Sequence, residues 1–182
     1  VAIVGATGKV GQYAALSISR IPYVNEVQLY GRPGSEGILE GIARDLIDSF
    51  AATGTDSSVS WSCSIEDLKG SDVIVFTAGV PRQAHQTRND LALQNARIVK
   101  DFAEKIAIIA PDALLLMITN PVDIMTHVAL KYSGKKSNEV FGIGTHLDSM
   151  RLKSAIASFF KVHVSEVHTR IIGEHGESMV PL

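Results

Sequence analysis

The chain has 182 residues, of which 46% are hydrophobic and 20% charged, and its formal net charge is −2. This length allows one large domain, or one domain and part of a second. The small net charge gives no general attraction to nucleic acid or to an anionic membrane, so we expect neither as a partner. The single cysteine, Cys63, excludes an internal disulfide and is typical of a protein from the reducing cytoplasm.

The most hydrophobic stretch runs from Ile106 to Ile118 and is interrupted by Pro111 and Asp112. A transmembrane helix needs about 20 apolar residues, so we predict no membrane span. The sequence also lacks the basic flank and long apolar run of a signal peptide. Because it begins with Val1 rather than methionine, we expect it to be part of a longer protein.

Apolar runs alternate with helical patterns along the first two thirds of the chain. Strands are predicted at Val1–Gly5, Glu26–Tyr30, Asp72–Thr77 and Ala113–Ile118. Helices are predicted at Val10–Ser19 and Ile38–Phe50. A longer helix follows the third strand, with one apolar face formed by Leu91, Ile98, Phe102, Ile106 and Ile109. Continuous apolar strands separated by helices indicate a parallel sheet that is covered on both faces.

The pattern changes after Pro121 to mostly helix, with short strands predicted at Val140–Gly142 and Thr169–Gly173. We therefore place a domain boundary near residues 120–123. The predicted domains are 1–122, which looks complete, and 123–182, which looks like the beginning of a second domain.

A glycine-rich turn joins the first predicted strand to the first predicted helix and reads Gly5-Ala6-Thr7-Gly8-Lys9-Val10-Gly11. A dinucleotide pyrophosphate approaches the backbone only where side chains are missing, and free N–H groups at a helix N-terminus then hold it. The spacing G-x-x-G-x-x-G is one residue longer than the common G-x-G-x-x-G. We interpret all seven residues as a cofactor-binding loop, the alternative being a tight turn without a ligand. The expected fold is α/β: a Rossmann dinucleotide-binding domain with a parallel sheet, followed by the start of an α+β substrate domain.

The end of the second predicted strand bears on the choice between NAD and NADP. NAD-binding Rossmann folds usually carry Asp or Glu about 20 residues beyond the loop, where it bonds the ribose 2′-hydroxyl. Gly31 stands at this place, and Arg32 follows it. An acid would repel a 2′-phosphate, whereas an arginine would attract one. We predict that both residues contact the cofactor and that NADP is preferred to NAD; the alternative is that Arg32 is a solvated loop residue.

Four later segments place polar and charged residues at the ends of predicted elements. They are Thr77-Ala78-Gly79-Val80-Pro81-Arg82 with Arg88 six residues on, Thr119-Asn120-Pro121-Val122, Leu147-Asp148-Ser149-Met150-Arg151 and Gly173-Glu174-His175-Gly176. Together with the glycine loop, these motifs in this order resemble the malate/lactate dehydrogenase family, and most closely its archaeal-type malate dehydrogenases. The resemblance runs along the whole chain. It implies reversible hydride transfer between NAD(P) and malate or oxaloacetate.

The resemblance also implies the acid–base residues. Reduction of a 2-oxo acid requires a proton at the carbonyl oxygen, and histidine suits this role because its ordinary pKa is about 6.5. His175 matches the family's catalytic histidine, and Asp148 matches the carboxylate that orients it. Arg151 matches the residue that grips the substrate's C1 carboxylate with a planar fork of donors.

The remaining substrate and cofactor residues follow from the same resemblance. Arg88 matches the arginine that polarises the reacting carbonyl, and Asn120 matches the residue that positions substrate and histidine. Arg82 matches the arginine that pairs with a second substrate carboxylate, which would disfavour a monocarboxylate such as pyruvate. Asn95 and Asn120 are also expected to contact the cofactor.

One segment departs from the family pattern. The stretch Gln83-Ala84-His85-Gln86-Thr87 lacks the usual glycine, and we expect this to slow loop closure. Tyr132 and Lys136 have the Tyr-x-x-x-Lys spacing of short-chain reductases, but Gly134 between them predicts a helix end. The sequence is also compatible with a lactate-type 2-hydroxy acid dehydrogenase and with a non-catalytic cofactor-binding fragment. We expect no metal, and a homodimer or homotetramer for the full-length protein.

Overall fold

Six parallel strands form one sheet in the order β3-β2-β1-β4-β5-β6. This computed structural model describes residues 1–81 and 87–182, with only the backbone at 88 and 89. The six strands are β1 (Ala2–Val4), β2 (Glu26–Tyr30), β3 (Ser58–Ser62), β4 (Val73–Phe76), β5 (Leu114–Met117) and β6 (Val140–Gly142). The chain starts in the middle of the sheet and winds outward in both directions, which is the order of a Rossmann fold. The predicted fold class is confirmed.

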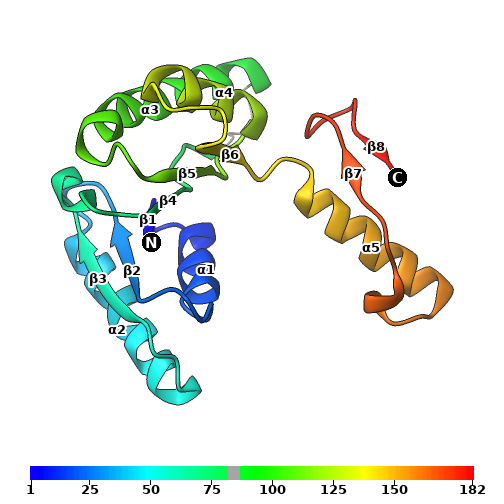
Figure 1. Cartoon of the computed structure of the whole chain (residues 1–182), viewed down its shortest axis with the longest axis horizontal. Helices are drawn as coiled ribbons and strands as arrows, with labels where there is room; N and C mark the ends of the chain where they lie inside the picture. Colours follow the sequence, from blue (N-terminus) through cyan, green and yellow to red (C-terminus); the bar gives the residue numbers. More distant parts are fainter. Residues whose placement is uncertain (82–86) are drawn as a thin grey trace.

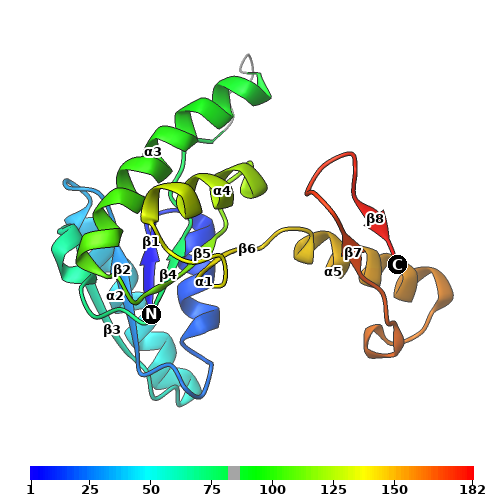
Figure 2. The ribbon, with the colours of Figure 1, turned by 45° about the horizontal axis from the view of Figure 1, so that its top comes forward.

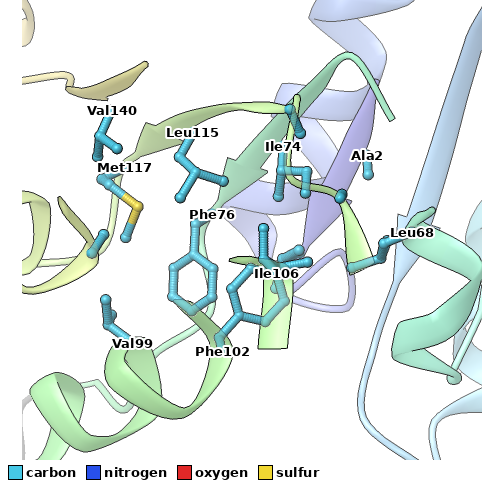
Figure 3. Packing of buried hydrophobic residues seen from close by; sticks show 14 of the residues in the cluster. Ala2, Leu68, Ile74, Phe76, Val99, Phe102, Ile106, Leu115, Met117 and Val140 are labelled. Atoms are coloured by element: carbon cyan, nitrogen blue, oxygen red, sulfur yellow. The ribbon is translucent and has the colours of Figure 1, made fainter. Parts of the chain in front are cut away.

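Helices cover both faces of the sheet, as the apolar strands predicted. They are α1 (Lys9–Ile18), α2 (Glu36–Thr53), α3 (Arg88–Ile109) and α4 (Val122–Ser133). One core cluster packs Phe76 and Met117 of the sheet against Phe102 and Ile106 of α3, with the Phe76 and Phe102 rings 4.8 Å apart (Figure 3). On the opposite face, Leu29 and its neighbours pack against α1 and α2. Burial of this apolar area is the main favourable term in folding.

Local sequence explains where α3 begins. Thr87 is its N-cap, and its side chain accepts a hydrogen bond from the N–H of Asp90 at 3.1 Å. The Asp90 carboxylate accepts in return from the hydroxyl and the N–H of Thr87, and these two bonds hold the pKa of Asp90 below its ordinary value. This reciprocal capping box satisfies two N–H groups that the helix itself leaves unpaired.

The sheet domain continues past residue 122, where the sequence suggested a boundary. Pro121 is the N-cap of α4, and α4 packs against α3 with Met125 fully buried in the first core cluster. β6 then pairs in parallel with β5, with Phe141 opposite Leu116. The expected second-domain strand at 140–142 is thus the edge strand of the first sheet, and the domain takes in residues up to 142.

The rest of the described chain lies beside the sheet domain and is joined to it after β6 (Figures 1 and 2). It contains α5 (His146–Phe160), a 3₁₀ turn η2 (Val164–Glu166) and the antiparallel pair β7 (Ile171–Ile172) and β8 (Val180–Pro181). The strand predicted at 169–173 is therefore present but shorter. Several apolar side chains here are open to solvent, Phe159 at 81% and Phe160 at 66%. None of the helices in the described residues is long and apolar enough to cross a membrane.

Candidate active site

The glycine loop lies at the end of β1 and is packed tightly against the end of β4. The N–H groups of Gly5 and Ala6 both donate to the carbonyl of Tyr30. Gly5 has φ +86°, and a Cβ there would come within 2.7 Å of the Ala78 nitrogen. A Cβ on Gly11 would meet the Gly5 carbonyl oxygen at 2.5 Å. Both glycines are therefore required by close approach of backbone to backbone.

Gly8 is different, because packing does not demand a glycine there. Its Cβ would meet only the Gly5 oxygen, at an acceptable 3.4 Å. Gly8 is the N-cap of α1 and offers no side chain to the first-turn N–H groups, which have no partner within the helix. A helix start of this kind is suited to hold a phosphate.

A groove of about 640 Å³ opens along this edge of the sheet. It is lined by the glycine loop, the end of β2, the segment after β4 and one side of α3. Of the seven predicted loop residues, Gly5, Thr7 and Gly8 line it, Ala6 and Gly11 are buried behind it, and Lys9 and Val10 are exposed on α1. The size of the groove and its bare backbone at a helix start fit a dinucleotide.

The β2 end of the groove holds both predicted residues, Gly31 and Arg32. A Cβ on Gly31 would come within 2.5 Å of the Ser35 hydroxyl and 3.1 Å of a Leu39 methyl carbon, so a larger residue there would require these side chains to shift. A carboxylate close by was not predicted from the sequence. Glu36 accepts a hydrogen bond from the N–H of Gly34 at 3.0 Å, and this bond holds the pKa of Glu36 below its ordinary value. It lies five residues beyond Gly31, on the first turn of α2, and not at the strand end where such an acid usually stands.

The predicted acid–base pair is brought together in the C-terminal part of the chain. The Nδ1 atom of His175 lies 2.5 Å from Oδ2 of Asp148, although the two residues are 27 positions apart. Asp148 is 8% exposed, and the His175 side chain is 31% exposed. Because Nδ1 donates to the carboxylate, the other ring nitrogen, Nε2, can exchange a proton with a substrate.

Arg151 lies one helical turn beyond Asp148 on α5, on the same face. Its Nη1 atom is 3.3 Å from the second carboxylate oxygen of Asp148, and its side chain is largely exposed. The guanidinium can therefore turn its remaining donors to a carboxylate beside His175.

Ser149 and Asp123 support this pair, and neither was predicted from the sequence to do so. The Ser149 hydroxyl accepts from the N–H of Ile171 at 2.8 Å and donates to the Thr145 carbonyl, which ties the first turn of α5 to β7. Asp123, in the first turn of α4, accepts from the N–H of His175 at 2.8 Å. Such roles depend on tertiary contacts, and no local pattern signals them.

Asn120 lies at the end of β5, next to the segment after β4, and its bond to Pro121 is cis. The side chain of Asn95 donates to the Asn120 carbonyl at 2.7 Å and accepts from the N–H of Val80 at 2.8 Å. Arg82 and the side chain of Arg88 lie outside the described residues, so their predicted substrate contacts stay predictions.

The short-chain reductase alternative has no geometric support. α4 ends at Ser133, and Gly134 follows in the left-handed conformation with φ +65°. Lys136 therefore lies beyond the helix, as the glycine predicted, and its N–H donates to Glu139. Tyr132 instead has the ammonium group of Lys100 5.0 Å from its ring centre.

Comparison with known proteins identifies the family to which the chain belongs. Residues 1–142 match the NAD-binding domain of lactate/malate dehydrogenase, and residues 145–182 match its alpha/beta C-terminal domain. The chain belongs to the lactate/malate dehydrogenase family. The predicted resemblance is confirmed, and the family's NAD-binding domain ends where β6 ends.

Individual relatives of this dehydrogenase family align along all or nearly all of the chain. A malate dehydrogenase of Methanothermobacter thermautotrophicus is 50% identical over 182 residues, covering 100% of this chain and 56% of the relative. An L-2-hydroxycarboxylate dehydrogenase (NAD(P)(+)) of Methanocaldococcus jannaschii is 50% identical, covering 100% and 58%. A lactate dehydrogenase of Cryptosporidium parvum, solved with lactic acid and nicotinamide adenine dinucleotide, has a TM-score of 0.90 at 36% identity, covering 99% and 56%. The chain thus spans little more than half the length of its relatives.

Proposed function

We propose that the complete protein is an NAD(P)-dependent malate dehydrogenase that interconverts malate and oxaloacetate. The observation that carries this proposal is the hydrogen bond between His175 and the buried Asp148, with Arg151 one turn away. The family match and the malate dehydrogenase name of the relative at 50% identity support it.

The chain's residues divide the work between holding the cofactor and moving a proton. When bound, the nicotinamide cofactor supplies or accepts the hydride. The glycine loop and the groove between β1, β2 and β4 would hold it. In oxaloacetate reduction, Nε2 of His175 donates the proton that the carbonyl oxygen takes up; in malate oxidation, it accepts the hydroxyl proton. Asp148 keeps Nδ1 as the donor toward itself and stabilises the ring when it is protonated.

Arg82 is proposed to select a dicarboxylate substrate. An arginine that a bound substrate covers without offering it an anionic partner is costly, so a substrate with one carboxylate is disfavoured. We expect Arg82→Gln to lower kcat/KM for oxaloacetate about 10²-fold relative to that for pyruvate. Arg20→Gln, on an exposed loop, is the control and should leave the ratio unchanged. The lactate-type alternative gains support if wild-type protein already prefers pyruvate.

The proposed preference for NADP rests on Arg32, which lines the β2 end of the groove. We expect Arg32→Gln to raise KM for NADPH about tenfold with little change for NADH, because a charge-assisted bond to the 2′-phosphate is lost. Glu36→Gln should act in the opposite direction, since it removes a negative charge from the first turn of α2, four residues beyond Arg32. A wild-type enzyme that strongly prefers NADH would overturn this preference.

A second candidate is that these 182 residues alone bind cofactor without turnover, which the exposed Phe159 and Phe160 of α5 favour. Apolar side chains of this size normally pack against further structure. We expect the complete protein, as a homodimer or homotetramer, to oxidise malate, whereas the 182-residue chain binds NADH without measurable turnover. Equal turnover numbers for the two would contradict this expectation.

A further inference from the structure

Asn95 lies on α3 behind the segment that follows β4, and only 2% of its surface is exposed. A buried amide must find a partner at each end, because an unpaired buried polar group is costly. Oδ1 accepts from the Val80 N–H at 2.8 Å, and Nδ2 donates to the Asn120 carbonyl at 2.7 Å. Only one orientation of the amide satisfies both groups, because the first partner is a donor and the second an acceptor.

The two partners of Asn95 belong to different strand ends. Val80 follows β4 and Asn120 follows β5, and these strands are neighbours in the sheet. Thr119 joins the same two segments by donating to the Ala78 carbonyl at 2.7 Å. The packing is close: a Cβ on Gly79 would come within 2.6 Å of a Thr119 methyl carbon and 3.2 Å of the Asn95 oxygen. A displacement of Asn95 would therefore move both segments.

We infer that Asn95 is a positioning residue for the dehydrogenase reaction, and this inference rests on the proposed function. Its side chain fixes the Val80 wall of the cofactor groove relative to the backbone of Asn120, the proposed substrate-positioning residue. The sequence had led us to expect Asn95 to touch the cofactor directly. Both ends of its amide bond protein backbone, so its effect reaches the reaction through Val80 and Asn120.

The assignment depends on a donor at Nδ2, and the Asn95→Asp variant tests this because aspartate has the same shape. One oxygen of its ionised carboxylate would accept from Val80, but the other would present a negative charge to the Asn120 carbonyl. A protonated carboxyl restores both bonds, since one oxygen accepts and the hydroxyl donates. Burial disfavours the charged form of a carboxyl and raises its pKa, so protonation comes within reach of mild acid.

The experiment compares Asn95→Asp and Asn95→Ala with Ser57→Ala in the complete protein. Ser57 is the control because its hydroxyl also ties distant backbone together: its single proton is shared between the carbonyls of Ser19, at 2.8 Å, and Val24, at 2.5 Å. It lies just before β3, at the opposite end of the strands from the groove.

At about pH 8, both Asn95 variants should lose about 10- to 100-fold in kcat/KM for oxaloacetate, because displaced catalytic geometry is costly. The Kd of the reduced cofactor, measured by fluorescence, should rise far less than kcat/KM falls, because Val80 is only one of the residues that line the groove. Ser57→Ala should lose thermal stability but keep its kcat/KM. Between about pH 8 and pH 5.5, the ratio of kcat/KM for Asn95→Asp to that for Asn95→Ala should rise as the carboxyl becomes protonated. The titration of any other group, such as His175, affects kcat/KM of both variants alike and therefore cancels in this ratio.

Three results would overturn the inference. The first is a loss of cofactor affinity as large as the loss of kcat/KM. The second is a ratio of kcat/KM for Asn95→Asp to that for Asn95→Ala that does not change with pH. The third is a loss of kcat/KM in the Asn95 variants no larger than that of a Ser57→Ala variant with the same Tm. If Asn95→Ala does not fold, the ratio of kcat/KM for Asn95→Asp to that for the wild-type protein is followed with pH instead, and the same rise is expected. A wild-type protein without malate or oxaloacetate turnover would overturn the proposed function and this inference with it. Active wild-type protein with unaffected Asn95 variants overturns the inference alone.

Discussion

Replacing His175 with glutamine should lower kcat for oxaloacetate reduction by about 10³-fold, because proton transfer from a positioned side chain contributes about 10²- to 10⁴-fold. Glutamine keeps a hydrogen-bonding group near Asp148 but cannot gain and release a proton near neutral pH. The binding of NADH should be retained, since the groove is lined by residues between Val4 and Lys105. Steady-state kinetics and fluorescence titration measure the two effects separately.

The control for this variant is His168→Gln, at an exposed histidine on the loop before β7. It should leave kcat close to the wild-type value, because no described contact links it to Asp148. If His175→Gln retained most of the wild-type kcat, another group would be the proton carrier. Tyr132 would then be the first to test, despite the end of α4 at Ser133.

Asp148→Asn should lower kcat by up to about 10⁴-fold, the loss expected when a catalytic histidine loses the carboxylate that fixes its tautomer. The 2.5 Å hydrogen bond from Nδ1 of His175 loses its charged acceptor, and the amide can turn its NH₂ group toward the ring. Arg151 loses its carboxylate partner as well, so KM for oxaloacetate should rise.

Asp112→Asn, at an exposed position after α3, provides the matched change of charge and should have no effect on kcat. Circular dichroism and Tm would show whether Asp148→Asn stays folded. A folded Asp148→Asn variant with a normal kcat would contradict the assignment of this carboxylate as the partner that orients His175.

The sequence predicted the parts of the fold that local hydrophobicity decides. β1, β4 and β5 were found because each is a buried or half-buried apolar run, and β2 because buried Val27 and Leu29 alternate along it. β3 was missed because serines alternate along it, as Ser58-Val59-Ser60-Trp61-Ser62, at the edge of the sheet. Pro121 was interpreted as a domain boundary, whereas proline also suits the start of a helix, and here it precedes α4.

The site was predictable where motifs fix the residue type, and less so where contacts decide the role. The pairing of His175 with Asp148 is present in the structure as predicted. The glycine loop was found, but the sequence could not tell that Gly5 and Gly11 serve packing while Gly8 leaves room for a ligand. Asp123 was missed because its partner, His175, lies 52 residues away and is recognised only once the chain is folded. Glu36 was missed although its partner, Gly34, is local, because it stands five residues beyond the strand end where the acid was expected.

The hydrogen bond from His175 to Asp123 has a consequence for how changes in this molecule combine. The groove residues lie between Val4 and Lys105, whereas the acid–base pair is carried by α5 and the loop after β7. Distant sites without shared partners contribute independent free energies, so substitutions at Arg32 and Asp148 are expected to act additively in a double-mutant cycle. Asp123 belongs to the sheet domain, yet its carboxylate accepts from the N–H of His175, so substitutions at Asp123 and Asp148 share a partner and are expected to be non-additive.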